Sequence, residues 1–204
     1  MNDIDAFIND VERYNAWAHT ARPIDLEDLL EFWNEKKTIG TPHQIQENSI
    51  RRRLKEPKRK IEDAANNSDD DVEEAIKTIA ASLTLQNKSD IYIRDDNQNK
   101  RGINLGQILP SWKPRERDYL LGAALFTPRL YSRVRFHHRS TRELLCAKWF
   151  KQKLSEGGSR TSVENIFFAK KYGLDVVRPN MKDVLLWLII LDENIREKAC
   201  QITP

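Results

Sequence analysis

Residues 134–150 read VRFHHRSTRELLCAKWF, and within this stretch the spacing of apolar residues changes from that of a strand to that of a helix. Residues 134–137 alternate apolar and polar side chains, which is the period of a half-buried strand. Further along, apolar residues recur at helical spacing, and Ser140 with Glu143 has the pattern of a capping box. The sequence therefore predicts a strand that ends just before a capped helix, with His138 at the junction.

His138 lies beside the predicted start of the helix, where backbone amides and the helix dipole favour an anion. An imidazole in this position can donate a hydrogen bond to a phosphate. A histidine next to a helix start can equally be a solvated or hydrogen-bonded loop residue without a ligand. The chemistry of the residue alone leaves both interpretations open.

The residues before this stretch predict several amphipathic helices. A first helix covers about seventeen residues, and a second has Asp25 as its predicted N-cap. Thr41 followed by Pro42 predicts the start of a third helix, and Ser68 with Asp71 predicts the capping box of a fourth. We interpret residues 1–66 as a helical domain, a small bundle.

Between the fourth helix and the capped one, short strands and helices alternate. A strand is predicted at residues 91–93, helices at 105–109 and 114–121, and a β-hairpin over 125–136. The order helix, strand, helix, helix, hairpin is that of a winged helix. We assign residues 67–156 to a winged-helix domain.

Gly157 and Gly158 form the clearest linker-like break in the chain. Beyond them, successive helices are predicted from Thr161, over residues 181–191 and over residues 192–202. We interpret residues 157–204 as the start of a helical, repeat-like sensor region. The predicted fold class is mainly α: a helical bundle, a winged-helix domain with a small β-hairpin, and then the start of a helical region.

Charge and cysteine content give few functional clues. The net charge of +3 is too small to indicate nucleic acid by itself. A basic run at residues 51–60 precedes an acidic stretch, and we interpret the pair as a solvated helix end with a charged turn, although such a run can also bind nucleic acid or an anionic surface. Cys146 and Cys200 are expected to be reduced core thiols.

The common sequence patterns of catalysis are missing. The chain contains no phosphate loop of the form GxxxxGK[ST], no HExxH, no CxxC and no GxSxG. Asp69 to Asp71 and Asp95-Asp96 are better explained as caps and turns than as cation ligands. We therefore predict that this chain is not an enzyme by itself, and that it has no catalytic residues, metal site or cofactor of its own.

No apolar run approaches the roughly 18 residues needed to cross a bilayer, and the N-terminus lacks a signal-peptide pattern. A soluble, cytoplasmic protein without a membrane partner is expected.

The residues Phe136, His138, Ser140, Glu143 and Ala147 resemble a segment of the NACHT-type STAND (signal-transduction) ATPases, written F-x-H-x-[ST]-x-[QR]-E-[FY]-[FL]-A-A. Cys146 departs mildly from the pattern, in which an alanine stands at that position. In that family the segment closes the winged-helix domain that follows the nucleotide-binding domain. The resemblance implies that His138 contacts the β-phosphate of ADP in an intact parent protein, with Ser140 and Glu143 in supporting roles.

Arg22-Pro23 also resembles this family, in which a small-x-Pro turn opens the helical domain and the proline rests on the adenine. The match is partial, since Ala21 stands where the family has glycine, and Pro23 can equally be a simple helix breaker. The resemblance implies a regulatory arm whose partners are a missing N-terminal nucleotide-binding domain and C-terminal sensor repeats. It also implies ADP or ATP with Mg in the parent, oligomerisation on activation and, from residues 185–188, similarity to bacterial antiphage-defence proteins.

The alternative function is a freestanding winged-helix DNA-binding protein. Its hairpin would supply basic side chains, and residues 114–121 would be the recognition helix. In that helix Arg115 and Arg117 alternate with Glu116 and Asp118, so the attraction to phosphates is weakened. Sequence-specific DNA is therefore not expected as a partner.

Overall fold

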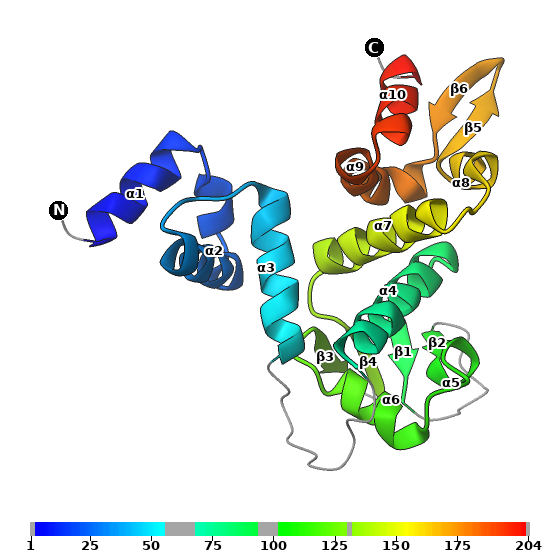
Figure 1. Ribbon diagram of the computed structural model, residues 1–204, viewed down its shortest axis with the longest axis horizontal. Helices are drawn as coiled ribbons and strands as arrows, with labels where there is room; N and C mark the ends of the chain where they lie inside the picture. The colour runs from blue at the N-terminus through cyan, green and yellow to red at the C-terminus, as the bar shows by residue number, and fades with distance from the viewer. Residues whose placement is uncertain (1–2, 56–67, 94–101, 130–131, 203–204) are drawn as a thin grey trace. The chain divides into compact units, whose positions relative to one another are not determined.

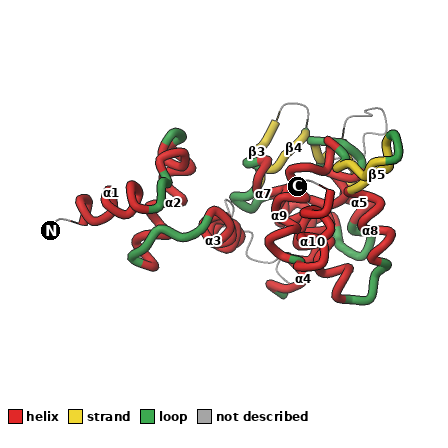
Figure 2. Tube along the Cα trace, turned by 90° about the horizontal axis from the view of Figure 1, so that it is seen from above, coloured by secondary structure: helices red, strands yellow, loops and turns green. Residues whose placement is uncertain are grey.

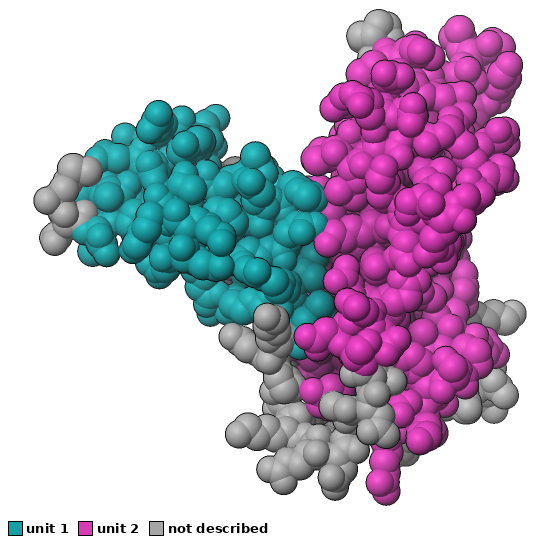
Figure 3. Space-filling view, viewed as in Figure 1, with its two compact units in different colours: residues 1–56 teal, residues 57–204 magenta. Residues whose placement is uncertain are grey.

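The structure is a computed structural model that describes residues 3–55, 68–93, 102–129 and 132–202. These residues fold mainly as helices, with a small mixed sheet and a separate β-hairpin (Figures 1 and 2). The chain divides into two compact units, Met1–Glu56 and Pro57–Pro204, which Figure 3 distinguishes by colour. The prediction of a mainly α chain is confirmed.

The first unit contains α1 (Asp3–Arg13), the 3-10 helix η1 (Trp17–Thr20), α2 (Pro23–Lys36) and α3 (Pro42–Lys55). A proline occupies the first position of α2 and of α3, where its missing N–H and fixed φ suit a helix start. The predicted cap of α3 is confirmed, because the amide of Gln44 donates to Thr41 Oγ1 at 3.3 Å. The predicted cap of α2 is wrong, since Arg22 is the N-cap and Asp25 already lies in the first turn.

The core of the first unit is a cluster of buried apolar side chains: Val11, Ala16, Leu29, Phe32, Trp33, Ile39 and Ile45. Trp33 is its largest member and also makes a polar contact, because its indole N–H donates to Asp10 Oδ2 at 3.0 Å. Phe7 packs edge-on against the same indole, with ring centroids 5.6 Å apart. These contacts fasten α1 to α2.

The second unit begins with eight elements: α4 (Asp69–Leu85), β1 (Asp90–Tyr92), β2 (Gly102–Asn104), α5 (Leu105–Ile108), α6 (Pro114–Leu121), β3 (Phe126–Arg129), β4 (Arg133–Phe136) and α7 (Arg139–Ser155). The predicted capping box of α4 is confirmed, with Ser68 accepting from the amide of Asp71 and the Asp71 carboxylate accepting from the amide of Ser68. The hydrogen bonds from Ser68 also hold the pKa of Asp71 below its ordinary value.

The sheet has the strand order β2-β1-β4-β3. β1 pairs antiparallel with β4 and parallel with β2, and β4 pairs antiparallel with β3. The sequence did not predict β2, which is only three residues long and is defined by its pairing with β1. Ile91 is opposite Ile103 on one side and Val134 on the other, so the centre of the sheet is apolar.

The helix α7 forms the packing centre of the second unit, because it packs against both α4 and α9 (Lys182–Leu191). Its buried apolar side chains are Leu144, Leu145, Cys146, Ala147 and Phe150. Phe150 also meets Phe167 edge to face, with ring centroids 4.9 Å apart. The apolar spacing that predicted this helix therefore corresponds to its buried face.

The remaining elements are α8 (Arg160–Phe167), β5 (Phe168–Lys171), β6 (Leu174–Val177), η2 (Pro179–Met181) and α10 (Glu193–Ile202). The expected run of helices is therefore interrupted by the β5–β6 hairpin, and the cap of α8 is Ser159 instead of Thr161. Tyr172 and Gly173 both have positive φ, which suits a two-residue hairpin turn. The proposed domain divisions at residues 66 and 156 stay predictions, and residue 66 lies outside the described residues.

Candidate functional site

The candidate site is the junction between β4 and α7, where the sequence placed His138. β4 ends at Phe136, and the amide of His137 donates to the carbonyl of Leu125 at 2.8 Å, which prolongs the pairing with the β3 side. His138 has the extended backbone of an N-cap residue, with φ −118° and ψ 140°. In the structure, His138 therefore lies where the sequence predicted it, at the start of a long helix.

The two neighbouring imidazoles lie together. The rings of His137 and His138 meet edge to face with centroids 4.6 Å apart, and His137 Nδ1 lies 2.6 Å from the hydroxyl of Thr127. Consecutive side chains of a regular strand point to opposite faces, but β4 ends at Phe136 and these two rings are in contact. The Nε2 atom of His138 is shielded from solvent, so the imidazole must turn before this atom reaches a ligand.

The predicted capping box of Ser140 with Glu143 does not form. The helix begins at Arg139, so Ser140 is already inside its first turn. The Glu143 carboxylate instead accepts from Arg139 Nε at 2.5 Å, and the same guanidinium contacts Asp183 on α9. Glu143 therefore contacts Arg139, which also reaches Asp183 on α9, instead of capping the helix.

Burial and ion pairing shift the pKa values of three side chains at this helix end. Burial raises the pKa of Glu143 above its ordinary value, although the hydrogen bond from Arg139 opposes the rise. The same hydrogen bond raises the pKa of Arg139, while burial lowers the pKa of Arg142. Arg142 donates from Nη1 to the carbonyl of Lys88 at 3.3 Å, which ties α7 to the turn after α4.

This helix end combines features that favour an anion. α7 is 17 residues long, its first turn contains no acidic residue, and Arg139 and Arg142 lie in its first two turns. Backbone amides and the helix dipole add partial positive charge at the same end. The carboxylates of Glu143 and Asp183 neutralise part of that charge, because both contact Arg139.

The other two predicted site residues lie in the first unit. Pro23 is the first residue of α2 and is exposed to solvent. Arg22 is its N-cap and pairs with Asp25 through Nε at 2.8 Å. Arg22 and Pro23 thus form one group, and His138, Ser140 and Glu143 form another in the second unit.

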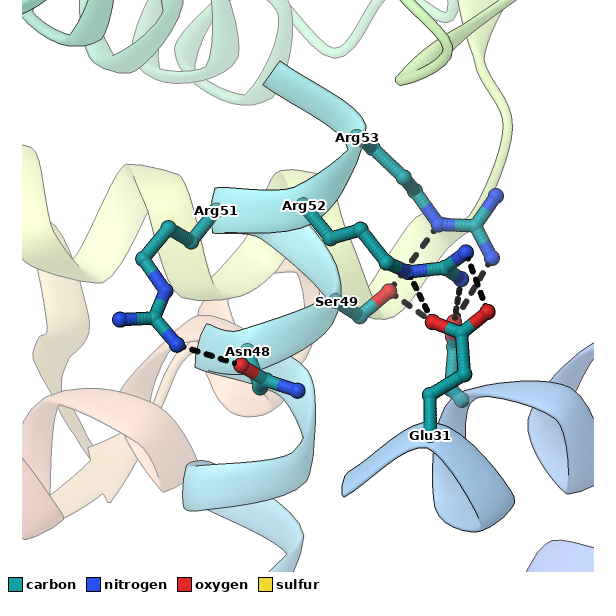
Figure 4. A network of polar contacts seen from close by, with 7 residues as sticks. Glu31, Asn48, Ser49, Arg51, Arg52 and Arg53 are labelled. Carbon is teal, nitrogen blue, oxygen red and sulfur yellow. Dashed lines mark hydrogen bonds and ion pairs between the residues drawn. The ribbon is translucent and has the colours of Figure 1, made fainter. Parts of the chain in front are cut away.

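A polar network between α2 and α3 was missed by the sequence analysis (Figure 4). The buried Asp28 carboxylate accepts from Ser49, Arg52 and Arg53 at 2.8 to 2.9 Å, and Glu31 also contacts Arg52. The interpretation of the basic run as a solvated helix end is therefore wrong for Arg52 and Arg53. The spacing of these polar residues could have predicted the network. On each helix they recur every three or four residues: Asp28 and Glu31 on α2, and Ser49, Arg52 and Arg53 on α3.

Other expectations can be compared with the described part of the chain. Cys146 is buried as expected, whereas Cys200 is exposed, which corrects its assignment to the core. No group of three or more His, Cys, Asp or Glu residues that could hold a metal ion occurs among the described residues. Asp95 and Asp96 lie outside them. Across the same residues, no helix has both the length and the apolar character needed to cross a bilayer.

Comparisons with protein-family models, with curated proteins and with solved structures found no match to this chain.

Proposed function

We propose that this chain is the regulatory, non-catalytic arm of a STAND-type ATPase switch. The observation that carries the proposal is the position of His138, directly after a strand and at the N-cap of a 17-residue helix. It occurs within residues 136–147, whose sequence resembles the family's phosphate-contacting segment. Residues in this position can bind an anion through the helix dipole and the imidazole together.

The order of elements in the second unit supports a winged-helix assignment for residues 67–156. α4, β1, α5, α6, the β3–β4 hairpin and α7 follow one another as helix, strand, two helices, hairpin and helix. The parallel strand β2 is an addition to this order. In this proposal, α7 closes the winged helix and residues 157–204 begin a sensor region.

The nucleotide in this proposal is held mainly by a separate nucleotide-binding domain, which supplies the phosphate loop and Mg. His138 donates to the β-phosphate of ADP and favours the resting state, while Pro23 contacts the adenine. The exposure of Pro23 supports its role, because a buried proline could not meet a base. Triggering at the sensor then releases these contacts and permits oligomerisation, and bacterial antiphage defence is the setting that the resemblance favours.

The test measures ADP affinity and resting activity in the full-length gene product. Hydrogen bonds to charged groups contribute roughly 1.5–3 kcal/mol, so His138→Ala should weaken ADP binding by about ten- to a hundredfold and raise untriggered activity. Thr127→Val is the matched control, because it removes the hydroxyl beside His137 and leaves His138 in place. Unchanged ADP affinity and resting activity in His138→Ala would contradict the proposal.

The second candidate, a winged-helix DNA-binding protein, is favoured by two exposed arginines on the β3–β4 hairpin, Arg129 and Arg135. Other features count against it. Arg133 pairs with Asp90 at 3.3 Å, and Arg139 pairs with Glu143. These two guanidinium groups are therefore already engaged within the second unit.

A further inference from the structure

The second unit contains a pocket of about 140 Å³ that the proposed function does not use. Its walls come from the end of β1, the junction of β2 with α5, and one side of α6, which are labelled in Figure 1. Tyr92, Asn104, Arg117 and Asp118 supply its polar groups, and Leu105 and Leu121 are among the apolar ones. An engineered cavity of similar volume binds benzene, so the pocket suits a ligand of roughly six non-hydrogen atoms.

Arg117 is the cationic group of this pocket, and it is held close to the backbone. A Cβ atom built on Gly106 would lie 2.5 Å from Arg117 Nη1, so the guanidinium rests against the start of α5 and would have to shift if residue 106 carried a side chain. The Nε of Arg117 is shielded from solvent and has no hydrogen-bond partner among the described residues. A partly buried guanidinium with an unsatisfied N–H is unfavourable unless an acceptor reaches it.

Tyr92 provides a second, independent sign of a missing acceptor. Its side chain is buried, with 8% exposed, and its hydroxyl has no hydrogen-bond partner within the described part of the chain. The ring lies close over Gly102, where an added Cβ would be 2.5 Å from Tyr92 Cε2. Buried phenol hydroxyls usually have a partner. Among the residues that the structure describes, two pocket-lining side chains therefore each have a buried donor without an acceptor.

The charged side chains that line the pocket indicate which charges the ligand carries. Arg117 attracts a carboxylate, whereas Asp118 is exposed on the same helix and repels a simple anion. A molecule that carries one negative and one positive group satisfies both residues.

We propose that this pocket binds a small zwitterion of the size of a free amino acid with a short side chain. Its carboxylate pairs with Arg117, and its ammonium group pairs with Asp118. The shielded Arg117 Nε and Tyr92 hydroxyl are the donors that this carboxylate would satisfy. This site lies within the second unit and does not depend on a nucleotide or on the proposed switch.

The test is an NMR titration of the whole chain with glycine, L-alanine, L-serine and L-threonine, and separately with acetate, methylammonium and inorganic phosphate. We expect saturable shifts of the amides of Tyr92, Gly106 and Arg117 with at least one amino acid. Acetate and methylammonium should bind at least about tenfold more weakly, because each satisfies only one of the two charges. Saturation by phosphate or acetate at equal affinity, or no saturation by any of the four amino acids, would overturn the proposal.

Variants separate the pocket from general effects of charge. Arg117→Gln and Gly106→Ala should each weaken amino-acid binding by about tenfold or more, the first by removing the cation and the second by displacing it. Arg115→Gln is the matched control, because Arg115 is exposed on the same helix and does not line the pocket. Asp118→Asn should reduce the preference for amino acids over acetate. An Arg117→Gln protein that remains folded and binds like Arg115→Gln would refute the assignment.

Discussion

At the scale of single residues, Asp28 is the group on which the polar contacts between α2 and α3 converge. Its Oδ1 accepts from both Arg52 and Arg53, and the Arg53 side chain is only 9% exposed. Asp28→Ala would leave that buried guanidinium without its carboxylate, which costs about 3–5 kcal/mol when a buried pair is broken. We expect hydrogen exchange in α2 and α3 to accelerate at least about a hundredfold, while exchange in α4 and α7 stays unchanged.

The control for this prediction is an exposed ion pair between the same two helices. Glu35 and Arg51 are 3.2 Å apart, and both side chains are more than 40% exposed. Surface pairs of this kind contribute little to stability, because water screens both charges. Glu35→Ala should therefore leave exchange in α2 and α3 almost unchanged. Equal effects of the two substitutions would show that the buried network does not stabilise the first unit as argued.

The two cysteines should differ strongly in reactivity. Burial raises the pKa of the Cys146 thiol to about 12, whereas Cys200 is exposed. The thiolate is the reactive form, and at pH 8 a thiol with this pKa is ionised to about one part in ten thousand. Iodoacetamide at pH 8 should label Cys200 alone in the native chain and both cysteines in denaturant, as read by mass spectrometry. Native labelling of Cys146 at the rate of Cys200 would contradict the buried position of α7.

At the scale of elements, Asp192 connects three helices of the second unit. Its carboxylate accepts from the amide of Ile195 at 3.0 Å, as an N-cap of α10, and pairs with Lys151 of α7 and Arg160 of α8. Burial opposes its ionisation, but these hydrogen bonds outweigh burial and lower the pKa of Asp192. Because the folded-state pKa is the lower one, the stabilisation is present above pH ~3.9 and is lost as the pH falls through the folded value.

Two substitutions separate the charge of Asp192 from its capping role. Asp192→Asn keeps an oxygen that can cap α10 and removes the two ion pairs, whereas Asp192→Ala removes both contributions. The alanine variant should be less stable than the asparagine variant by about 1 kcal/mol, measured by hydrogen exchange in α10 at pH 7. Identical stability of the two variants would exclude the capping role.

Whether an element of this fold could be predicted from the sequence depends on whether local or distant contacts define it. The capping box of α4 and the proline start of α6 were predicted because local contacts fix them. The strand β2 was not, because its three residues are extended only through pairing with β1, which is distant in sequence. The β5–β6 hairpin was missed because its turn residues, Tyr172 and Gly173, are not the usual Asn-Gly or Asp-Gly.

The candidate site likewise has some features that the sequence predicted and others that it did not. The position of His138 followed from the change of period, which is a local signal. The role of Glu143 did not follow, because it shares Arg139 with Asp183, and Asp183 lies on α9, 44 residues from Arg139. The Arg117 pocket was also outside the reach of sequence analysis, since it is formed where three segments meet.

At the scale of the whole molecule, the near balance of positive and negative charges limits the affinity of the chain for DNA. The sequence has 34 Lys and Arg against 31 Asp and Glu. On the candidate recognition helix α6, the Glu116 carboxylate accepts from the backbone amide of Lys113 and remains beside Arg115 and Arg117. Affinity for duplex DNA comes mainly from cations that neutralise phosphates, and on α6 each arginine has a carboxylate next to it in the sequence.

We therefore expect weak, non-specific DNA binding, with a Kd of roughly 10⁻⁶ M or weaker at physiological salt. Fluorescence anisotropy with a random pool of duplexes measures the affinity, and sequencing of the bound fraction measures the selectivity. Arg129→Ala combined with Arg135→Ala should reduce the salt dependence by about two phosphate contacts, because these exposed arginines lie on the β3–β4 hairpin. Enrichment of one sequence with an affinity tighter than about 10⁻⁷ M would favour a DNA-binding regulator over the nucleotide switch, because specific recognition needs base contacts that the charge balance alone does not supply.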